Sequence, residues 1–568
     1  MRYAGQTKGV AKQILLSAMF TLACLSAAAQ QLTVTVDSVG QLGVQLSEDI
    51  RYTMTDLKIC GPLNVSDLKV IQLLTNRVKP KKADEAILTS LDMSEAEIVE
   101  SKGIIRTRAN TLPAAMFLNS KTLERIILPN NLTEISRSCF SGCINLKEVV
   151  LPEVTEVIAE YAFNNCASLE KITMPTHLKI IKSHAFDGCA MLDEVGFPET
   201  LTLIDAFAFN NCKAIESIHL KESATQRIND NAFAGCIQLK EIDLPQSMDA
   251  IGNDAFINCG ALEHINMPDA ISEIGNNAFE NCSSLNAISL TGIKRMGSGV
   301  FKGCTRLTNV NLYGSLSNIG SEAFSGCTSL TAISVPSSVK AIGARAFLEC
   351  RSLEKIEMPE ALTRINDNAF ENCTSLKTLY FPKFTKQLGK NTFENCISLD
   401  SVFIQGFVEK LDDGLFSNCR SLRVVILPVS IKSIGDNTFE QCLLLSEIKL
   451  PISISSIGDN AFEKCLSITN MIIPAACKSI GSAAFRECSG LTRVELPAAL
   501  KKIGSNAFAK CSALTEIAAS SPTPPSIASS TFKGVTTDAC RVVVPRGAKN
   551  NYQKNKSWKK LSQIIEQD

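Results

Sequence analysis

Hydrophobic and polar residues alternate along this chain in a short pattern that recurs many times. In a clear copy, LEKIEMPEALTRINDNAFENC from Leu353 to Cys373, apolar residues stand at the first, fourth and sixth positions, around the polar Lys355 and Glu357. This alternation predicts a short strand with one buried and one solvent-exposed face. Pro359 ends the predicted strand, because proline cannot donate a backbone hydrogen bond to a neighbouring strand.

The second half of the unit predicts a tight turn. Leu362 and Ile365 form a second apolar step, and Ala369, Phe370 and Cys373 then pack inward from a turn that we expect to be 3₁₀-like. Seventeen copies carry Cys three positions after Phe, and twelve of these have Gly or Asn just before the Cys. Gly and Asn favour a left-handed backbone. Five copies have Glu, Gln or Lys there, so we predict that this conformation is preferred rather than required.

The spacing of this unit is regular over more than 400 residues. Of the eighteen intervals between successive Phe residues, fifteen are 23 residues long and the others are 22 or 24. A fixed period of this length predicts stacked turns that share one continuous core. The Phe residues are Phe117, Phe140, Phe163, Phe186, Phe209, Phe233, Phe256, Phe279, Phe301, Phe324, Phe347, Phe370, Phe393, Phe416, Phe439, Phe462, Phe485, Phe508 and Phe532.

The unit L-x-x-I-x-L-P-x-x-L-x-x-I-G-x-x-A-F-x-x-C resembles the BspA-type leucine-rich repeats of bacterial surface proteins, from about residue 117 to 535. The resemblance implies a mainly β solenoid, a right-handed superhelix with a parallel sheet on its concave face. Short strands and 3₁₀ turns would line the convex face. We expect about nineteen turns over residues 106–535, between an N-terminal cap (30–105) and a C-terminal cap (536–568).

The two caps have their own patterns. In the first, Leu32 to Val36 alternates as a strand, and a helix opened by Asn64 or Ser66 precedes a repeat-like strand over Ile87 to Met93. In the second, Arg541 to Pro545 reads as a strand. Residues 552–565 include the only Trp and predict a short final helix. Both caps would cover the apolar ends of the stack.

The first 29 residues predict a signal peptide that directs secretion. A positive start (Arg2, Lys8, Lys12) precedes an apolar stretch of twelve residues and a run of Ala at 27–29, which offers a cleavage site. A lipoprotein reading around Cys24 is disfavoured because residues 21–23, Thr-Leu-Ala, make a poor lipid-attachment box. The apolar stretch is too short to span a bilayer, which needs about 20 residues. Cleavage of residues 1–29 removes three positive charges and leaves the otherwise neutral chain with a net charge of −3. This charge gives no basis for nucleic-acid binding.

The positions of the cysteines predict that they pack in the core and do not form disulfides, metal sites or catalytic groups. Seventeen of the 22 occupy the repeat slot, and neighbouring Cα atoms would lie about 4.8 Å apart, which is close enough for disulfides. In-register side chains do not point at each other, however, and seventeen is odd, so we favour reduced, buried thiols. No Cys-x-x-Cys zinc pattern, phosphate-binding loop or nucleophile motif occurs. We therefore expect no cofactor, no metal and no enzymatic activity.

Two groups of outward-facing residues are candidate binding sites. Tyr380, Phe403 and Ile426 occupy the same strand position in three successive repeats, with Val424 beside Ile426. They should form an exposed apolar strip, which marks an interface or simply stabilises the strands. The second group is a polar cluster of His219, Glu241, Asp243 and His264, which is either a metal or sugar site or a solvated stretch of the sheet.

The resemblance implies a monomeric, non-catalytic protein that is secreted or exposed on the outer cell surface. Its concave face would adhere to a host matrix protein, another cell-surface protein or a glycan. The alternative is a periplasmic or envelope scaffold, or a glycan-capturing partner of an uptake system. Lysines in the C-terminal cap form a positive surface that is either merely solvated or binds acidic glycans. They are Lys549, Lys554, Lys556, Lys559 and Lys560.

Overall fold

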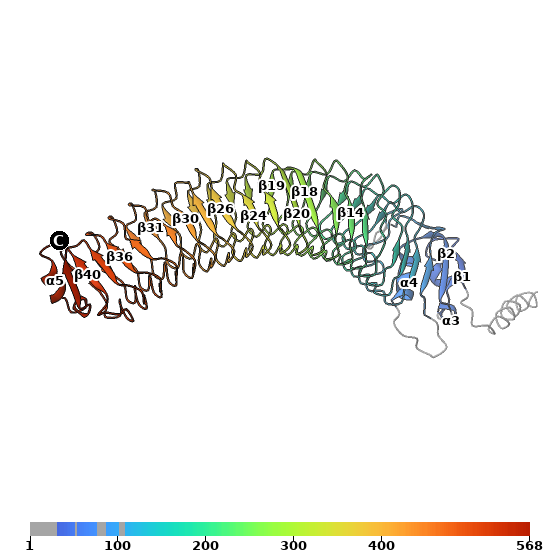
Figure 1. The fold of residues 1–568 in the computed structure, drawn as a ribbon. Helices are drawn as coiled ribbons and strands as arrows, with labels where there is room; N and C mark the ends of the chain where they lie inside the picture. The colour runs from blue at the N-terminus through green and yellow to red at the C-terminus, as the bar shows by residue number, and fades with distance from the viewer. Residues whose placement is uncertain (1–30, 52–53, 77–86, 102–107, 568) are drawn as a thin grey trace, which may run out of the picture. The chain divides into compact units, whose positions relative to one another are not determined.

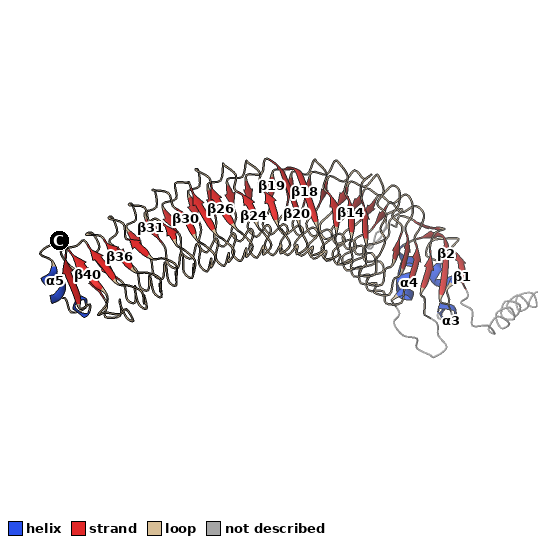
Figure 2. Cartoon of the chain, viewed as in Figure 1, coloured by secondary structure: helices blue, strands red, loops and turns tan. Residues whose placement is uncertain are grey.

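The structure, a computed structural model, describes residues 31–51, 54–76, 87–101 and 108–567. These residues form two compact units that divide after Leu178. The predicted signal peptide, residues 1–29, lies outside the described residues. In both units successive turns lie side by side in chain order (Figure 1), and strands and loops form nearly all of the structure (Figure 2). The paired strands run parallel, as predicted for a repeat solenoid.

The first unit contains the N-terminal segment and the first repeats. One sheet runs in the order β1-β2-β3-β5-β7-β9, and β4 pairs with the far end of β2. The repeat sheet therefore continues into the segment predicted as a cap. The elements are β1 (Gln31–Thr35), α2 (Leu42–Gln45), α3 (Glu48–Arg51), β2 (Asp56–Leu63), α4 (Val65–Thr75), β3 (Ser90–Asp92), β4 (Ala96–Ile98), β5 (Arg125–Ile127), β6 (Glu134–Ile135), β7 (Glu148–Val150), β8 (Val157–Ile158) and β9 (Lys171–Ile172).

Helix α4 begins where the sequence predicted. The side chain of Asn64 accepts hydrogen bonds from the backbone N–H groups of Ser66 and Asp67, at 2.8 and 3.4 Å. The carboxylate of Asp67 accepts one in return from the N–H of Asn64, which completes a capping box. Leu68, Ile71 and Leu74 form the buried face of the helix. Of the two predicted N-cap residues, Asn64 is therefore the one used.

The second unit is built from two rows of strands, a long row and a row of two-residue strands. The long row is β12 (Ser217–His219), β14 (Glu241–Asp243), β16 (His264–Asn266), β18 (Ala287–Ile293), β20 (Asn309–Gly314), β22 (Ala332–Ser334), β24 (Lys355–Glu357), β26 (Thr378–Phe381), β28 (Ser401–Ile404), β30 (Val424–Ile426), β32 (Glu447–Ile448), β34 (Asn470–Ile472), β36 (Arg493–Leu496), β38 (Glu516–Ala519), β40 (Arg541–Val544) and β41 (Gln563–Glu566). We call the surface formed by the outward residues of this row the long-strand face.

The short row alternates with the long row along the chain. Its strands pair in register from one repeat to the next, for example Arg364 with Gln387 and Ile365 with Leu388. The short row is β10 (Ile180–Ile181), β11 (Leu203–Ile204), β13 (Arg227–Ile228), β15 (Ala250–Ile251), β17 (Glu273–Ile274), β19 (Arg295–Met296), β21 (Asn318–Ile319), β23 (Ala341–Ile342), β25 (Arg364–Ile365), β27 (Gln387–Leu388), β29 (Lys410–Leu411), β31 (Ser433–Ile434), β33 (Ser456–Ile457), β35 (Ser479–Ile480), β37 (Lys502–Ile503) and β39 (Ser526–Ile527).

The Phe residues that set the repeat stack into a continuous ladder inside each unit. The ring centroids of Phe347 and Phe370 lie 5.0 Å apart, those of Phe370 and Phe393 lie 5.3 Å apart, and the rings are nearly parallel. All three side chains are fully buried. Because each ring packs against the ring of the next turn, the ladder fixes the distance between turns.

Each of the seventeen Phe-x-x-Cys turns contains left-handed residues, and one of them always precedes the Cys. Glu349, Gln441, Lys464, Glu487 and Lys510 also have positive φ, between 59° and 62° for four of them and 58° for Lys464. The prediction that this conformation is only preferred is therefore corrected. The backbone N–H of Lys464 donates to the carbonyl of Arg486 in the next turn at 2.8 Å, a bond that requires this geometry. The positive φ values also interrupt the i to i+3 bonded turns before they become 3₁₀ helices.

Glycines after the short strands let successive turns approach closely. A Cβ atom on Gly320 would lie 2.1 Å from the carbonyl oxygen of Gly297 in the previous turn. We expect Gly320→Ala to lower the free energy of unfolding by about 2–3 kcal/mol, since the backbone of the neighbouring turn must move. Gly260→Ala is the control, because its Cβ would meet nothing closer than Ser283 Oγ at 3.7 Å. Equal urea midpoints for the two variants would contradict this explanation.

The C-terminal segment closes the long row with two more strands. Strand β40 confirms the strand predicted over 541–545, but residues 563–566 form β41, parallel to β40, where a helix was predicted. The helical part is confined to α5 (Lys549–Lys554) and the 3₁₀ helix η1 (Trp558–Lys560). The fully buried indole of Trp558 packs on Phe532, the last ring of the ladder, at 5.6 Å. Within the described residues, none of the helices has the length and apolar character that crossing a bilayer requires.

Candidate functional site

The repeat cysteines are buried donors and not nucleophiles. Every cysteine within the described residues is free, and those of the repeat slot are fully buried. The thiol of Cys373 donates to the carbonyl oxygen of Phe347 in the previous turn at 3.2 Å, and Cys396 does the same to Phe370 at 3.3 Å. Burial raises the pKa of these thiols, to about 12 for Cys259, so they stay protonated at neutral pH. The small, weakly polar thiol therefore serves the packing of each turn.

The predicted polar cluster does not bring its two histidines to the same strand position. In-register pairing places Glu241 beside His264 and Asp243 beside His219, so the two histidines occupy different positions along their strands. His219 Nδ1 lies 3.0 Å from Asp243 Oδ2, and both side chains are exposed. No group of three or more His, Cys, Asp or Glu side chains in the described part of the chain could hold a metal ion. The geometry favours the solvated-stretch interpretation.

The predicted apolar strip lies together on the long-strand face. Tyr380 pairs with Phe403 and Phe403 pairs with Ile426 across strands β26, β28 and β30, as expected from the repeat. The Tyr380 and Phe403 rings stack 4.8 Å apart at an interplanar angle of 5°. Tyr380 and Ile426 are more than half exposed, whereas Phe403 and Val424 are half-buried by their neighbours. Each stacked ring thus leaves part of its apolar surface in water.

Further exposed apolar residues enlarge this strip beyond the sequence prediction. They lie mostly in the loops that follow the strands, and their exposed fractions range from 51% to 83%. The strip and these residues together are called the apolar patch below. Phe384 and Phe407, and likewise Val429 and Ile452, are spaced by 23 residues in the sequence, but they lie outside the strand positions from which the strip was predicted. The added residues are Phe384, Phe407, Val429, Ile452 and Ile472.

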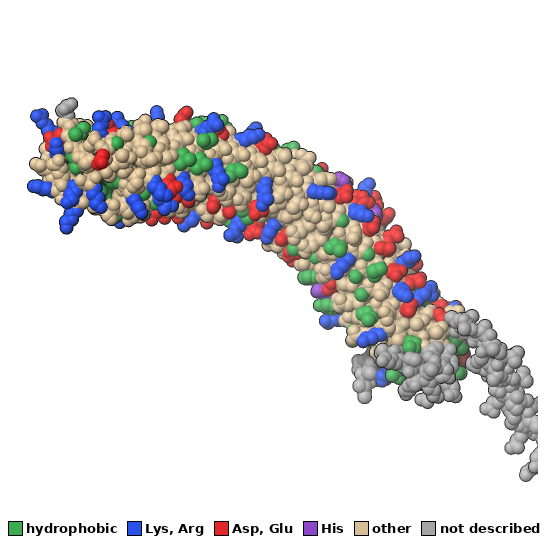
Figure 3. All heavy atoms as spheres, turned by 60° about the horizontal axis from the view of Figure 1, so that its bottom comes forward, with side chains coloured by type: hydrophobic (Ala, Val, Ile, Leu, Met, Phe, Trp, Pro, Cys, Tyr) green, Lys and Arg blue, Asp and Glu red, His purple; other side chains and the backbone are tan. Residues whose placement is uncertain are grey.

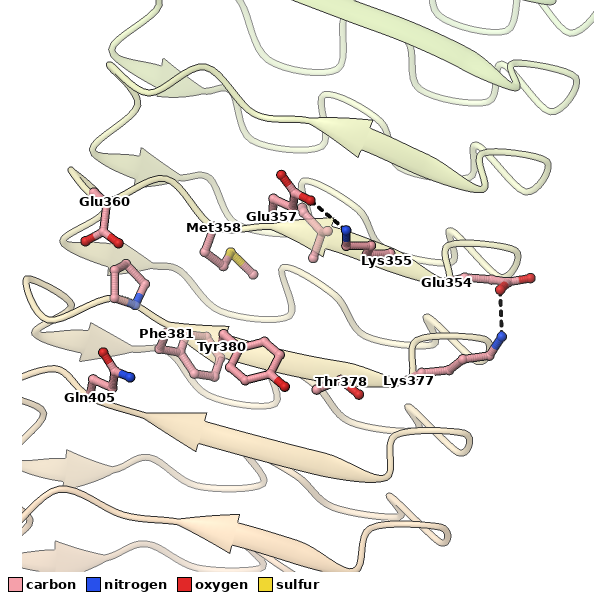
Figure 4. Close-up of a pocket in the computed structure, with 12 residues that line it drawn as sticks. Glu354, Lys355, Glu357, Met358, Glu360, Lys377, Thr378, Tyr380, Phe381 and Gln405 are labelled. Carbon is pink, nitrogen blue, oxygen red and sulfur yellow. Dashed lines mark hydrogen bonds and ion pairs between the residues drawn. The ribbon is translucent and has the colours of Figure 1, made fainter.

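Two hollows lie at the two ends of the apolar patch in chain order. The first, of about 790 Å³, has Tyr380 and Phe381 on one side and Met358 on the other (Figure 4). The second, of about 680 Å³, is lined by Ile452, Ile472 and neighbouring residues of β32 to β36. The space-filling view shows apolar side chains in small groups among charged ones (Figure 3). Because of these hollows, the surface at the two ends of the patch is concave rather than flat.

Four of the five charged residues around the first hollow form two ion pairs, and the fifth, Glu360, is exposed. Lys377 contacts Glu354 at 2.6 Å, and Lys355 contacts Glu357 at 2.6 Å (Figure 4). These ion pairs are exposed, so each adds little stability, but they leave no uncompensated charge among these four residues. The surface also exposes apolar area, and burying that area against a partner would release free energy.

The chain is similar to several solved leucine-rich repeat proteins. A leucine-rich repeat protein of Bacteroides ovatus is 26% identical, with a TM-score of 0.49 over 73% of this chain and 88% of that chain. A leucine rich cell surface protein of Faecalibacterium prausnitzii is 23% identical, with a TM-score of 0.35 over 54% of this chain and 87% of its own. The leucine-rich repeat protein of T. pallidum is 27% identical, with a TM-score of 0.24 over 32% and 78%. No curated protein matches the chain.

The family comparison is more extensive than any of these individual likenesses. The model of the BspA type leucine rich repeat region matches residues 110–226, 204–319, 294–423 and 409–537, which together span well over half of the chain. The matched residues contain the Phe ladder, the buried thiols of the repeat slot and the apolar patch. This chain therefore belongs to the BspA type leucine-rich repeat family.

Proposed function

We propose that this chain is a secreted or cell-surface binding protein that captures a protein partner on its apolar patch. The single observation that carries the proposal is the run of exposed apolar side chains on successive turns between Tyr380 and Ile472. Exposed apolar side chains that recur among charged residues are typical of protein interfaces. Family membership supports the same role, because stacked repeats present an extended surface to a partner.

The form of the patch favours a partner with apolar side chains. Aromatic residues supply large contact area at a low cost in side-chain entropy, and they are frequent hot spots of binding. The stacked rings of Tyr380 and Phe403 hold each other in place before binding. The two hollows at its ends offer places for projecting side chains of the partner. A partner held mainly by charge would find Lys355 and Lys377 beside the first hollow already paired.

The double substitution Tyr380→Ser and Phe403→Ser tests this proposal. Removing both rings should weaken binding by at least about 2 kcal/mol, roughly thirtyfold in Kd, if they are hot spots. The measurement is surface plasmon resonance with the secreted chain against immobilised host matrix proteins. The control variant is Tyr313→Ser with Ile237→Ser, because both residues are exposed and lie outside the patch. Thermal melting of both variants checks that the solenoid stays folded.

Two outcomes would oppose the proposal. If the patch variant binds every captured matrix protein as tightly as the unaltered chain, the patch is not the interface. If the control variant loses as much affinity, binding depends on general surface apolarity rather than on this patch. The alternative role as an envelope scaffold predicts that protease treatment of intact cells leaves the protein uncut, whereas a surface adhesin is cleaved.

A further inference from the structure

The C-terminal end of the chain carries an excess of positive charge. Residues 533–568 contain eight Lys and Arg but only three Asp and Glu, whereas the chain as a whole contains 57 of each. The positive charge is therefore concentrated in the last repeat turn and in the cap that follows it. A concentration of one sign of charge attracts ligands of the opposite sign.

Cations elsewhere on the second unit are commonly paired across neighbouring turns. Lys377 contacts Glu354 at 2.6 Å, and Lys432 contacts Glu409 at 2.7 Å. In residues 533–567, Arg541 is paired in this way with Glu516. The other seven cations of this segment are exposed and have no ion pair with any described residue: Lys533, Arg546, Lys549, Lys554, Lys556, Lys559 and Lys560.

The nearby carboxylates are already engaged. Asp538 Oδ1 accepts a hydrogen bond from the hydroxyl of Ser562 at 3.2 Å. Glu566 Oε1 accepts from the backbone N–H groups of Gly547 and Lys549 at 3.0 and 3.2 Å. Both carboxylates thus hold the loops of the cap, and the lysine side chains remain available to a ligand.

A pocket of about 390 Å³ lies between the last repeat turn and the cap and combines two of these ammonium groups with hydroxyls. Lys533 comes from the turn after β39, and Lys560 comes from η1. No acidic side chain is among the described residues that line it. The hydroxyl side chains in its lining are Ser529, Ser530, Thr537 and Ser557.

We propose that this pocket binds an anionic group, a sulfate, phosphate or carboxylate, carried by an acidic polysaccharide. Two ammonium groups and several hydroxyl donors are the groups that bind such an anion by charge-assisted hydrogen bonds. The remaining five unpaired cations lie between Lys533 and Lys560 in the sequence and would contact further charges of the same polymer. This pocket is separate from the apolar patch, so the binding proposal made for it does not depend on the proposed function.

The cap favours a glycan over a nucleic acid or a membrane. Stacking on bases or insertion into lipid needs exposed aromatic or apolar side chains. Tyr552 and Trp558 are fully buried and donate to the carbonyl oxygens of Ser521 and Pro525. Ile565 is the only large apolar side chain exposed among residues 536–567. The accessible surface of the cap therefore offers cations and neutral polar groups.

The test measures binding of the full secreted chain to dextran sulfate, to polygalacturonate and to neutral dextran by surface plasmon resonance. We expect binding to one or both anionic polymers, none to neutral dextran, and loss of binding in high salt. The variant Lys533→Gln with Lys560→Gln should lower affinity at least about tenfold. The variant Lys340→Gln with Lys386→Gln removes the same charge from exposed positions far along the solenoid and should change affinity less than twofold.

Several results would overturn the proposal. Equal loss of affinity in both variants would mean that only net charge matters and that the pocket is not a site. Binding to neutral dextran as strong as to dextran sulfate would exclude recognition of the anion. Tighter binding to phosphatidylglycerol vesicles or to single-stranded DNA than to either anionic polymer would assign the cap to a different class of ligand. Preference for dextran sulfate or for polygalacturonate identifies the anionic group.

Discussion

Raising the pH from 7 to 10 is expected to destabilise the solenoid more than any single substitution. Burial raises the pKa of the repeat thiols, to about 12 for Cys511 and well above the ordinary value for Cys373 and Cys419. In the unfolded chain the same thiols ionise at about pH 8.5. The folded state therefore keeps protons that the unfolded state loses. The resulting stability is complete below about pH 8.5 and falls as the pH rises toward the folded pKa.

The expected magnitude follows from the number of thiols. Each buried thiol contributes a loss of about 1.4 kcal/mol per pH unit over this range. A segment of five turns that unfolds together would lose roughly 7 kcal/mol per pH unit, which is comparable with the whole stability of an ordinary domain. Urea unfolding followed by circular dichroism at pH 7, 9 and 10, in the presence of a reductant, measures the effect.

A single replacement isolates the contribution of one thiol. Cys373→Ala should lower stability at pH 7, because the small cavity and the lost hydrogen bond to Phe347 are unfavourable. It should also make the loss of stability with pH shallower by about 1.4 kcal/mol per pH unit. The control is Cys60→Ala, because Cys60 lies outside the repeat slot and is only partly buried. Unfolding midpoints that do not change between pH 7 and 10 would contradict the whole explanation.

Because the sequence repeats, both the fold and the apolar strip could be predicted from it. In a parallel, in-register sheet, residues 23 positions apart lie side by side, so Tyr380, Phe403 and Ile426 could be placed together without any coordinates. The same rule identifies the Phe and Cys positions as core. Periodicity of this kind reports spatial neighbours directly, which an irregular sequence does not.

Backbone features set by the stack were harder to predict. Lys464 and Glu487 are poor candidates for positive φ by residue type, yet stacked turns require it of them. A left-handed residue other than Gly is disfavoured by about 1–2 kcal/mol, and the hydrogen bond to the next turn offsets this. Tertiary context thus overrides the local preference that Gly and Asn show.

Two other differences have a long-range cause. Strand β41 forms because the outer edge of β40 offers unpaired backbone groups, which a local pattern over residues 563–566 does not reveal. Phe407 and Val429 were missed because they lie in loops, where exposed or buried positions have no fixed alternation. In each case the deciding neighbour lies in another turn rather than next along the chain.

Phe370→Ala should have the second large effect, because it interrupts the ring ladder in the interior of the second unit. Phe370 is fully buried, and its ring stacks on Phe347 and Phe393 at 5.0 and 5.3 Å. Truncation removes both stacking contacts and leaves a cavity, so the free energy of unfolding should fall by about 3–5 kcal/mol. The matched control is Phe384→Ala, since its ring is 51% exposed. We expect that substitution to change stability by less than about 0.5 kcal/mol.

The repeat architecture also predicts how Phe370→Ala unfolds. Each turn contacts only its neighbours, so a weak turn in the middle of the stack should uncouple the turns on its two sides. Trp558, the only tryptophan, lies buried against Phe532 near the C-terminal end, and its fluorescence reports unfolding at that end. Circular dichroism reports all turns together. In Phe370→Ala the urea transition measured by fluorescence should separate from the transition measured by circular dichroism. In the unaltered chain the two transitions should lie closer together. Coincident transitions in both proteins, with equal midpoints, would show that the ring ladder does not couple the turns.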